Sequence, residues 1–161
     1  MKITFIYLLV SFALFAASPK DLDLKNFVKK GEALIEVTIF KIDVYIASYF
    51  EKQAGSEQAL ELSYQIDVEK KHSIEGWTEG FKPLDKEKYK GAIQWVNDQT
   101  SDMKKGDRFI IWKNGDLVRF YHNNKLSSEI RDKLVSEIVM FPWIGDIPLD
   151  KKIKKKLLGT K

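Results

Sequence analysis

The chain has 161 residues, enough for one domain with a substantial core, and its 27 basic and 23 acidic residues give a formal net charge of +4. This balance is too even for a dedicated nucleic-acid-binding protein. The chain has no cysteine and only two histidines, His72 and His122, which lie far apart in the sequence, so it lacks the ligand patterns of the common metal sites.

The N-terminal residues have the order of a secretion signal. Lys2 is followed by the almost wholly apolar stretch 3–15 and then by small residues. As a helix the apolar stretch would reach about 20 Å, short of a hydrocarbon core of roughly 30 Å, which disfavours a permanent anchor. We expect cleavage after Ala16 or Ala17 and export, most simply to the periplasm, with an extracellular location as the alternative destination. A buried N-terminal strand or an uncleaved anchor is the alternative. With residues 1–17 as the signal peptide, residues 18–161 form one domain.

The first half of that domain contains patterns of both strands and helices. Residues 31–49, after a polar stretch over 21–30, are rich in β-branched and aromatic side chains and predict one long strand or two strands joined near Phe40 and Lys41. Apolar and polar residues alternate over 60–66, as in a half-buried strand.

The spacing of apolar residues then becomes helical. It predicts a helix over 68–81 that is closed by Pro83. It predicts a second helix over 85–103, with Asp85 as its N-cap.

In the second half, residues 109–112 and 117–121 predict a hairpin with a two-residue turn, for which Asn114-Gly115 is the signal, and Asn123-Asn124 marks another turn. Ser127 or Ser128 is then expected to cap a helix that kinks or stops before Pro142. The apolar face of that helix would consist of Ile130, Leu134, Ile138 and Phe141. A short basic helix over 149–158, ended by Gly159, closes the chain.

This order of elements lacks regular βαβ alternation and predicts an α+β fold, with a mainly antiparallel sheet covered by helices on one face. Aromatic residues occur in every predicted element. Most of them must fill the core, but between a sheet and its helices they can also line an apolar cleft for a hydrophobic ligand.

No motif for a chemical reaction is present. The chain has no phosphate-binding glycine loop, no Gly-x-Ser-x-Gly turn and no cysteine nucleophile, and Glu69, Glu75 and Glu79 are best explained as a solvated helix face. We therefore predict no catalytic residue, no metal site and no cofactor.

The densest run of charge lies near the C-terminus. Its lysines would either complement the dipole of the last helix or make weak contact with an anionic membrane surface. These residues are Lys151, Lys152, Lys154, Lys155 and Lys156.

An ordered set of short motifs resembles the bacterial chalcone-isomerase-like proteins. The set covers roughly 27–159, and its members follow one another in the family's order. It consists of Gly31-Glu32, the run from Phe40 to Ala47, Leu60 to Tyr64, Lys105-Gly106-Asp107, Arg119 to Asn123, Trp143 to Pro148, and Leu157-Leu158-Gly159. The resemblance implies an open-faced sandwich, in which a large antiparallel sheet carries a layer of helices and a ligand cleft lies between them. Plant enzymes of this kind close a flavonoid ring in that cleft, and related plastid proteins bind fatty acids there.

The residues that the resemblance associates with catalysis are not matched. Ala33 stands where the family has an arginine, Phe40 where it has a threonine, and Pro142 where it has a hydroxyl residue. The stretch 68–83 has neither the tyrosine nor the asparagine of the family helix. Ring closure needs preorganised donors, which these side chains lack.

The leading hypothesis is therefore a non-catalytic exported domain that binds a small hydrophobic molecule, such as a lipid or fatty acid. We expect its cleft to include Ala33, Phe40, Tyr45 and Tyr64, with a tyrosine hydroxyl as the polar contact. An intramolecular lyase of the chalcone isomerase type and an envelope interaction protein that uses the basic C-terminal helix are the alternatives.

Overall fold

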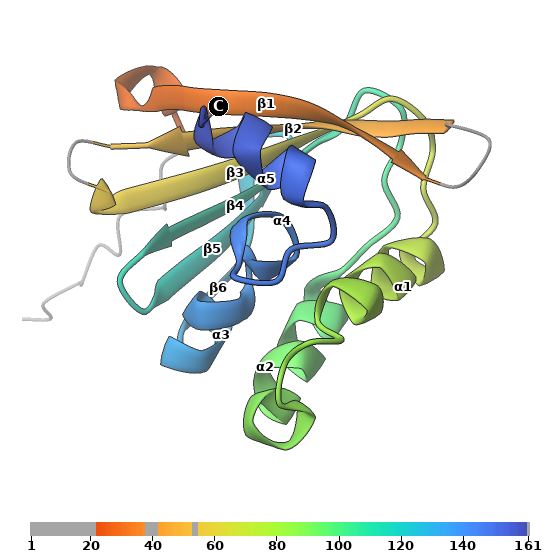
Figure 1. Cartoon of the computed structure of the whole chain (residues 1–161), viewed down its shortest axis with the longest axis vertical. Helices are drawn as coiled ribbons and strands as arrows, with labels where there is room; N and C mark the ends of the chain where they lie inside the picture. Colours follow the sequence, from red (N-terminus) through yellow and green to blue (C-terminus); the bar gives the residue numbers. More distant parts are fainter. Residues whose placement is uncertain (1–21, 38–41, 53–54, 161) are drawn as a thin grey trace, which may run out of the picture.

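A computed structural model describes residues 22–37, 42–52 and 55–160 of the chain. Within them, six strands form one antiparallel sheet in which each strand pairs with its sequence neighbours. The strands are β1 (Val28–Val37), β2 (Ile42–Glu51), β3 (Glu57–Tyr64), β4 (Arg108–Asn114), β5 (Leu117–His122) and β6 (Lys125–Arg131). Helices α1 (Lys70–Gly80), α2 (Lys86–Gln99), α3 (Lys133–Ile138), α4 (Phe141–Ile144) and α5 (Lys151–Leu158) lie on one face of the sheet (Figure 1). This arrangement confirms the predicted α+β fold.

Most predicted elements are present with shifted ends. The pattern over 31–49 forms two paired strands, and the first begins at Val28, inside the stretch read as polar. The hairpin between β4 and β5 has the expected two-residue turn, but it is centred on Gly115-Asp116, one residue later than predicted, because Gly115 takes the positive φ of 56°. No helix in the described part of the chain is both long and apolar enough to span a bilayer.

The prediction of a helix that starts at Ser127 or Ser128 is wrong, because residues 125–131 form strand β6. Asn123 and Asn124 both have positive φ, which suits a tight hairpin turn and returns the chain alongside β5. The helix begins only after Asp132, whose carboxylate accepts a hydrogen bond from the Val135 amide at 2.9 Å.

Pro142 belongs to a separate short helix. It lies in the first turn of α4, where a missing amide proton costs little, so α3 ends before it. The basic helix α5 is close to its predicted range, with Asp150 as its N-cap and Gly159 at its C-terminus with φ 64°.

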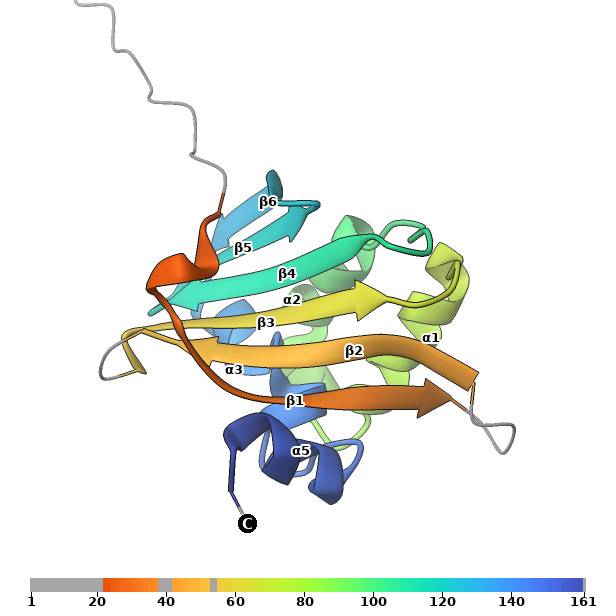
Figure 2. The same cartoon turned by 90° about the horizontal axis from the view of Figure 1, so that it is seen from above.

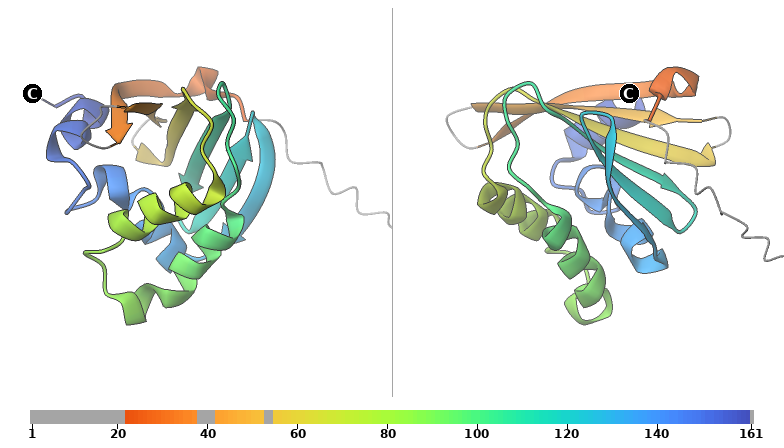
Figure 3. Two further views of the ribbon diagram at one scale, coloured as in Figure 1. Left: turned by 90° about the vertical axis from the view of Figure 1, so that its right-hand side faces the viewer. Right: turned by 180° about the vertical axis from the view of Figure 1, so that it is seen from behind.

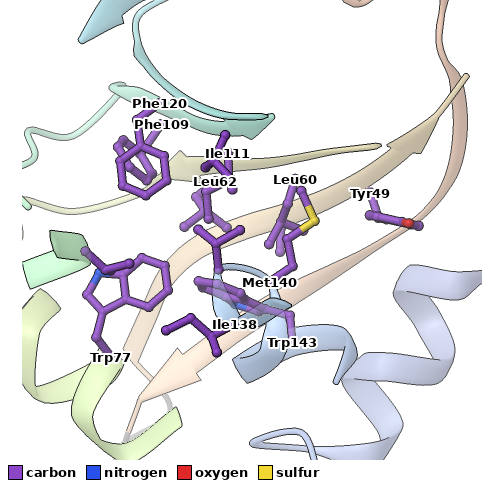
Figure 4. Packing of buried hydrophobic residues seen from close by; sticks show 14 of the residues in the cluster. Tyr49, Leu60, Leu62, Trp77, Phe109, Ile111, Phe120, Ile138, Met140 and Trp143 are labelled. Carbon is purple, nitrogen blue, oxygen red and sulfur yellow. The ribbon is translucent and has the colours of Figure 1, made fainter. Parts of the chain in front are cut away.

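The two faces of the sheet carry different amounts of apolar surface. The helix-bearing face holds the main core, and Figure 4 shows its side chains packed between sheet and helices. The opposite face has a smaller cluster around Ile110, Trp112 and Tyr121, covered by Leu22, Leu24 and Phe27 of the N-terminal segment. Figure 2 shows the helices beneath the sheet and this segment on the other side.

The α1–α2 hairpin is joined to the sheet by two connecting segments, which pair with each other. The segments after β3 and before β4 run side by side (Figure 3), and Val68 and Met103 exchange two backbone hydrogen bonds of 2.8 Å. In the described residues, the main backbone neighbours of α1 and α2 are α4 and α3 rather than strands. Large side chains bridge the gap to the sheet, as where Trp95 packs on Phe120 with ring centroids 5.1 Å apart.

Helix α5 is docked on strand β1 through direct backbone contact. A Cβ atom added to Gly31 would lie 1.9 Å from the carbonyl oxygen of Lys156, and one added to Gly159 would lie 2.6 Å from the carbonyl oxygen of Lys30. Leu157 is fully buried in the main core. The absence of a side chain at Gly31 therefore lets the last helix close the β1 edge of the core.

We predict that Gly31→Ala destabilises the protein by about 2 kcal/mol or more, because the new methyl group meets backbone that cannot rotate away. Urea unfolding followed by circular dichroism measures the change. Gly91→Ala in α2 is the matched control, because a Cβ atom there meets only open space. Alanine favours helix over glycine by about 0.5–1 kcal/mol, so the control is expected to be neutral or stabilising. Equal stability of the two variants would contradict this account of α5 docking.

Candidate functional site

An apolar cavity of about 90 Å³ lies between the sheet and helices α1 and α4. Strands β2, β3 and β4 supply one wall, the paired connections supply a second, and the two helices supply the third. The lining consists of Val44, Tyr45, Leu62, Tyr64, Val68, Ser73, Gly76, Trp77, Thr100, Met103, Phe109, Pro142, Trp143 and Leu149. Most of the surface that these residues present to the cavity is apolar, so the cavity is suited to apolar groups.

Two tryptophans set the distance between the helical layer and the sheet. Trp77 of α1 and Trp143 of α4 meet edge to face with ring centroids 5.2 Å apart. Trp77 also stacks on Phe81 at 5.3 Å. Behind them, a Cβ atom at Gly80 would come within 2.6 Å of Pro142, so this glycine allows α1 to approach α4 closely.

The sheet side of the cavity presents a pair of tyrosines. Tyr45 and Tyr64 are cross-strand partners on β2 and β3, with ring centroids 5.4 Å apart. The indole N–H of Trp143 donates a hydrogen bond of 3.1 Å to the Tyr45 hydroxyl oxygen. Sheet and helix are thus joined by a polar contact within an apolar surrounding, where hydrogen bonds are strong.

Burial keeps both tyrosine hydroxyls protonated. It raises the pKa of Tyr45 to about 12, although the indole N–H of Trp143 offsets part of the effect. Burial also raises the pKa of Tyr64 above its usual value, aided by the neighbouring Tyr45 and opposed by the Ser73 hydroxyl. At neutral pH these groups are hydrogen-bond donors and acceptors, not bases.

The structure brings together two of the four residues predicted for the cleft. Tyr45 and Tyr64 line the cavity, whereas Ala33 is buried in β1 opposite Ala47 and is not part of the lining. Phe40 lies outside the described residues. A role for any of the four in ligand binding stays a prediction.

The basic helix is bound to the domain on its apolar side. Ile153, Leu157 and Leu158 pack in the main core, and Lys154 donates a hydrogen bond of 2.7 Å to the carbonyl oxygen of Gly145. Contact between this docked helix and an anionic surface would therefore be electrostatic, without insertion of its apolar face. The exposed lysines available for it are Lys151, Lys152, Lys155 and Lys156.

Sequence reasoning did not single out Trp77, Trp143 or Gly76 for the cavity. Trp143 entered only as part of a family motif, and Trp77 only as one of the aromatic residues found in every predicted element. Gly76 carried a usable signal, because glycine is unfavourable within a helix and this one is exposed, with open space where a Cβ atom would lie. Gly76 and Leu149 are the exposed residues of the described lining, so the mouth of the cavity lies beside them, and Gly76 contributes no side chain there.

Comparison with known proteins agrees with this architecture. A sequence model of the chalcone isomerase-like family matches residues 25–159. Among solved structures, the fatty-acid-binding protein AtFAP1 of Arabidopsis thaliana is similar, with a TM-score of 0.66, 13% sequence identity, and coverage of 90% of this chain and 91% of that one. At this identity the likeness concerns the fold alone, and it confirms the fold that the sequence motifs predicted. No curated protein matches the sequence.

We predict that Tyr45 and Trp143 are energetically coupled through their hydrogen bond. A double-mutant cycle of Tyr45→Phe and Trp143→Phe should give a coupling free energy of about 0.5–1.5 kcal/mol in urea unfolding. The control cycle pairs Tyr45→Phe with Trp112→Phe, whose indole lies on the opposite face and donates to Glu57. Its two changes should add to within about 0.5 kcal/mol. Additivity in the first cycle as well would show that the contact does not hold α4 to the sheet.

Proposed function

Because the chain belongs to the chalcone isomerase-like family, we propose that it is a non-catalytic member that binds a small hydrophobic ligand, such as a lipid or fatty acid. The ligand would bind in the cavity between β2, β3, β4 and helices α1 and α4. The observation that carries the proposal is the apolar lining of this cavity, which is interrupted by few polar groups. The fatty-acid-binding protein AtFAP1, which shares the fold, supports a ligand of this class.

The present size of the cavity limits how such a ligand enters. A cavity of about 150 Å³ accommodates benzene, and pockets for drug-sized ligands measure about 300–1,000 Å³, so 90 Å³ holds only part of a lipid chain. Binding of a longer chain therefore requires α1 to move away from α4. The attachment of the α1–α2 hairpin favours that motion, because two connecting segments, which pair with each other at Val68 and Met103, join its backbone to the strands.

The composition of the lining supports a role without catalysis. The described residues of the lining include no aspartate, glutamate, lysine, arginine or histidine. The tyrosine hydroxyls stay protonated at neutral pH, so neither is poised as a general base. Stabilising a negative charge that develops during a reaction needs aimed donors or cations, and this lining offers little for that purpose.

We also propose that the domain works after export, as a member of the bacterial exported branch, with residues 1–17 acting as a signal peptide. Their sequence is the main support, and they lie outside the described residues. Leu22, Leu24 and Phe27 pack against the sheet, and the Leu22 amide donates to the carbonyl oxygen of Asn124 at 3.3 Å. Cleavage after Ala16 or Ala17 would therefore leave in place the residues that cover the face of the sheet opposite the helices.

Gly76→Phe is expected to weaken binding of the uncharged hydrophobic dye Nile red at least about tenfold, because the aromatic ring would occupy the open mouth of the cavity. Fluorescence titration measures the affinity, and circular dichroism checks that the fold is kept. Gly91→Phe is the matched control, since Gly91 is also exposed, helical and surrounded by open space but lies outside the lining. It should bind the dye as the wild type does.

Two outcomes would oppose the binding proposal. If the wild-type protein neither binds Nile red nor carries any molecule detectable by native mass spectrometry, the cavity is not a ligand site. If Gly76→Phe and Gly91→Phe bind the dye equally well, binding takes place elsewhere.

Export predicts a mature N-terminus at Ala17 or Ser18. Expression of the full chain in a Gram-negative host, followed by fractionation and intact mass measurement, tests this expectation. Leu9→Arg breaks the apolar stretch and is expected to keep the chain uncleaved inside the cell. Recovery of wild-type protein that still begins at Met1 in the cytoplasmic fraction would contradict the export proposal.

A further inference from the structure

Any polar group that a ligand brings into the cavity meets an uncharged surrounding. Besides the indole N–H groups of Trp77 and Trp143, the polar side chains of the lining are Tyr45, Tyr64, Ser73 and Thr100, all of them neutral hydroxyls. Thr100 already donates its proton to the carbonyl oxygen of Val96 at 2.8 Å. Among the described residues, the wall of the cavity therefore contains hydroxyl and indole N–H groups and no positively charged side chain.

The hydroxyl of Tyr45 is the lining group whose hydrogen bonding bears most directly on a ligand. Its oxygen accepts from the indole N–H of Trp143, and no atom of the described residues accepts the proton of its hydroxyl. A buried hydroxyl has both donor and acceptor capacity, and an unused donor in an apolar site favours an acceptor brought by a ligand. A carbonyl, ether or hydroxyl oxygen would meet this requirement.

A carboxylate would be poorly accommodated at the same place. Moving an ion out of water into an apolar site without a paired cation costs far more than moving a neutral polar group. Lys154 of α5 donates to the carbonyl oxygen of Gly145, and neither residue belongs to the described lining. A single neutral donor cannot replace a cation there.

We propose that the cavity selects uncharged ligands, namely apolar molecules with one hydrogen-bond acceptor such as a ketone, ester or alcohol, whose oxygen accepts from the Tyr45 hydroxyl. This inference rests on the proposed function and specifies its ligand class. A fatty acid binds in this arrangement in its protonated form, with the head inside and the chain directed to the mouth at Gly76 and Leu149.

Ligands of equal chain length test the selectivity. Isothermal titration calorimetry at pH 8 compares 2-decanone and 1-decanol with decanoate and decyltrimethylammonium. Both uncharged compounds should bind at least about tenfold more tightly than either ion, because a charge within the cavity would lose its hydration without gaining a paired ion. Decanoate binding as tightly as 2-decanone would overturn the proposal, since the head group would then lie in water or meet a cation.

Two tyrosine variants locate the polar contact. Tyr45→Phe should weaken binding of 2-decanone about fivefold or more, and it should weaken binding of p-xylene, which has no acceptor, by a clearly smaller factor. Tyr49→Phe is the matched control on the same strand and the same face, because the Tyr49 hydroxyl donates to Glu51 and lies outside the lining. An equal effect of both variants on 2-decanone would overturn the role of Tyr45.

The outcomes separate this inference from the broader proposal. If decanoate binds as well as the ketone and Gly76→Phe blocks both, the cavity is a hydrophobic site without the proposed selectivity. If neither p-xylene nor any decyl compound binds, both the ligand function and its selectivity are refuted.

Discussion

The hydrogen bond from Trp143 to Tyr45 is the polar contact that links the helical layer to the sheet at the wall of the cavity. It joins α4 to the middle of β2, and the edge-to-face contact of Trp143 with Trp77 carries the connection on to α1. Sheet and helices are thereby held at a separation set by aromatic rings rather than by small side chains. Aromatic rings fill most of the space between the sheet and the helices. The cavity opens beside Gly76, which has no side chain.

The helices are attached to the sheet with unequal strength, and this difference relates stability to function. Helix α5 meets β1 backbone to backbone at Gly31, so the edge of the core near Leu157 is closed tightly. The α1–α2 hairpin instead stands away from the strands and depends on paired connections and on long side chains. A ligand that widens the cavity would therefore displace the weakly attached hairpin while the α5 side of the domain stays in place.

The fold of the family and the side chains of this site bear differently on the class of ligand. The family fold supplies a gap between sheet and helices, which is compatible with the fatty-acid-binding protein that shares it. The lining of this chain holds hydroxyl groups without an ion of either sign. Since an uncompensated charge is costly in an apolar site, the same gap is suited here to a neutral molecule. Function follows from the side chains that line the gap rather than from the fold that creates it.

The sequence by itself determined the fold class and most of the elements, because alternation, helical spacing and capping residues such as Asp85 and Asp150 act over a few neighbouring residues. It failed at 125–131, where apolar residues at ambiguous spacing became a strand once the Asn123-Asn124 turn returned the chain beside β5. Motif order also indicated the family, and with it Tyr45 and Tyr64. Only the tertiary structure decided that these two residues share a cavity with Trp77 and Trp143 and that Ala33 lies outside its lining, because residues distant in sequence meet there through packing that no local pattern encodes.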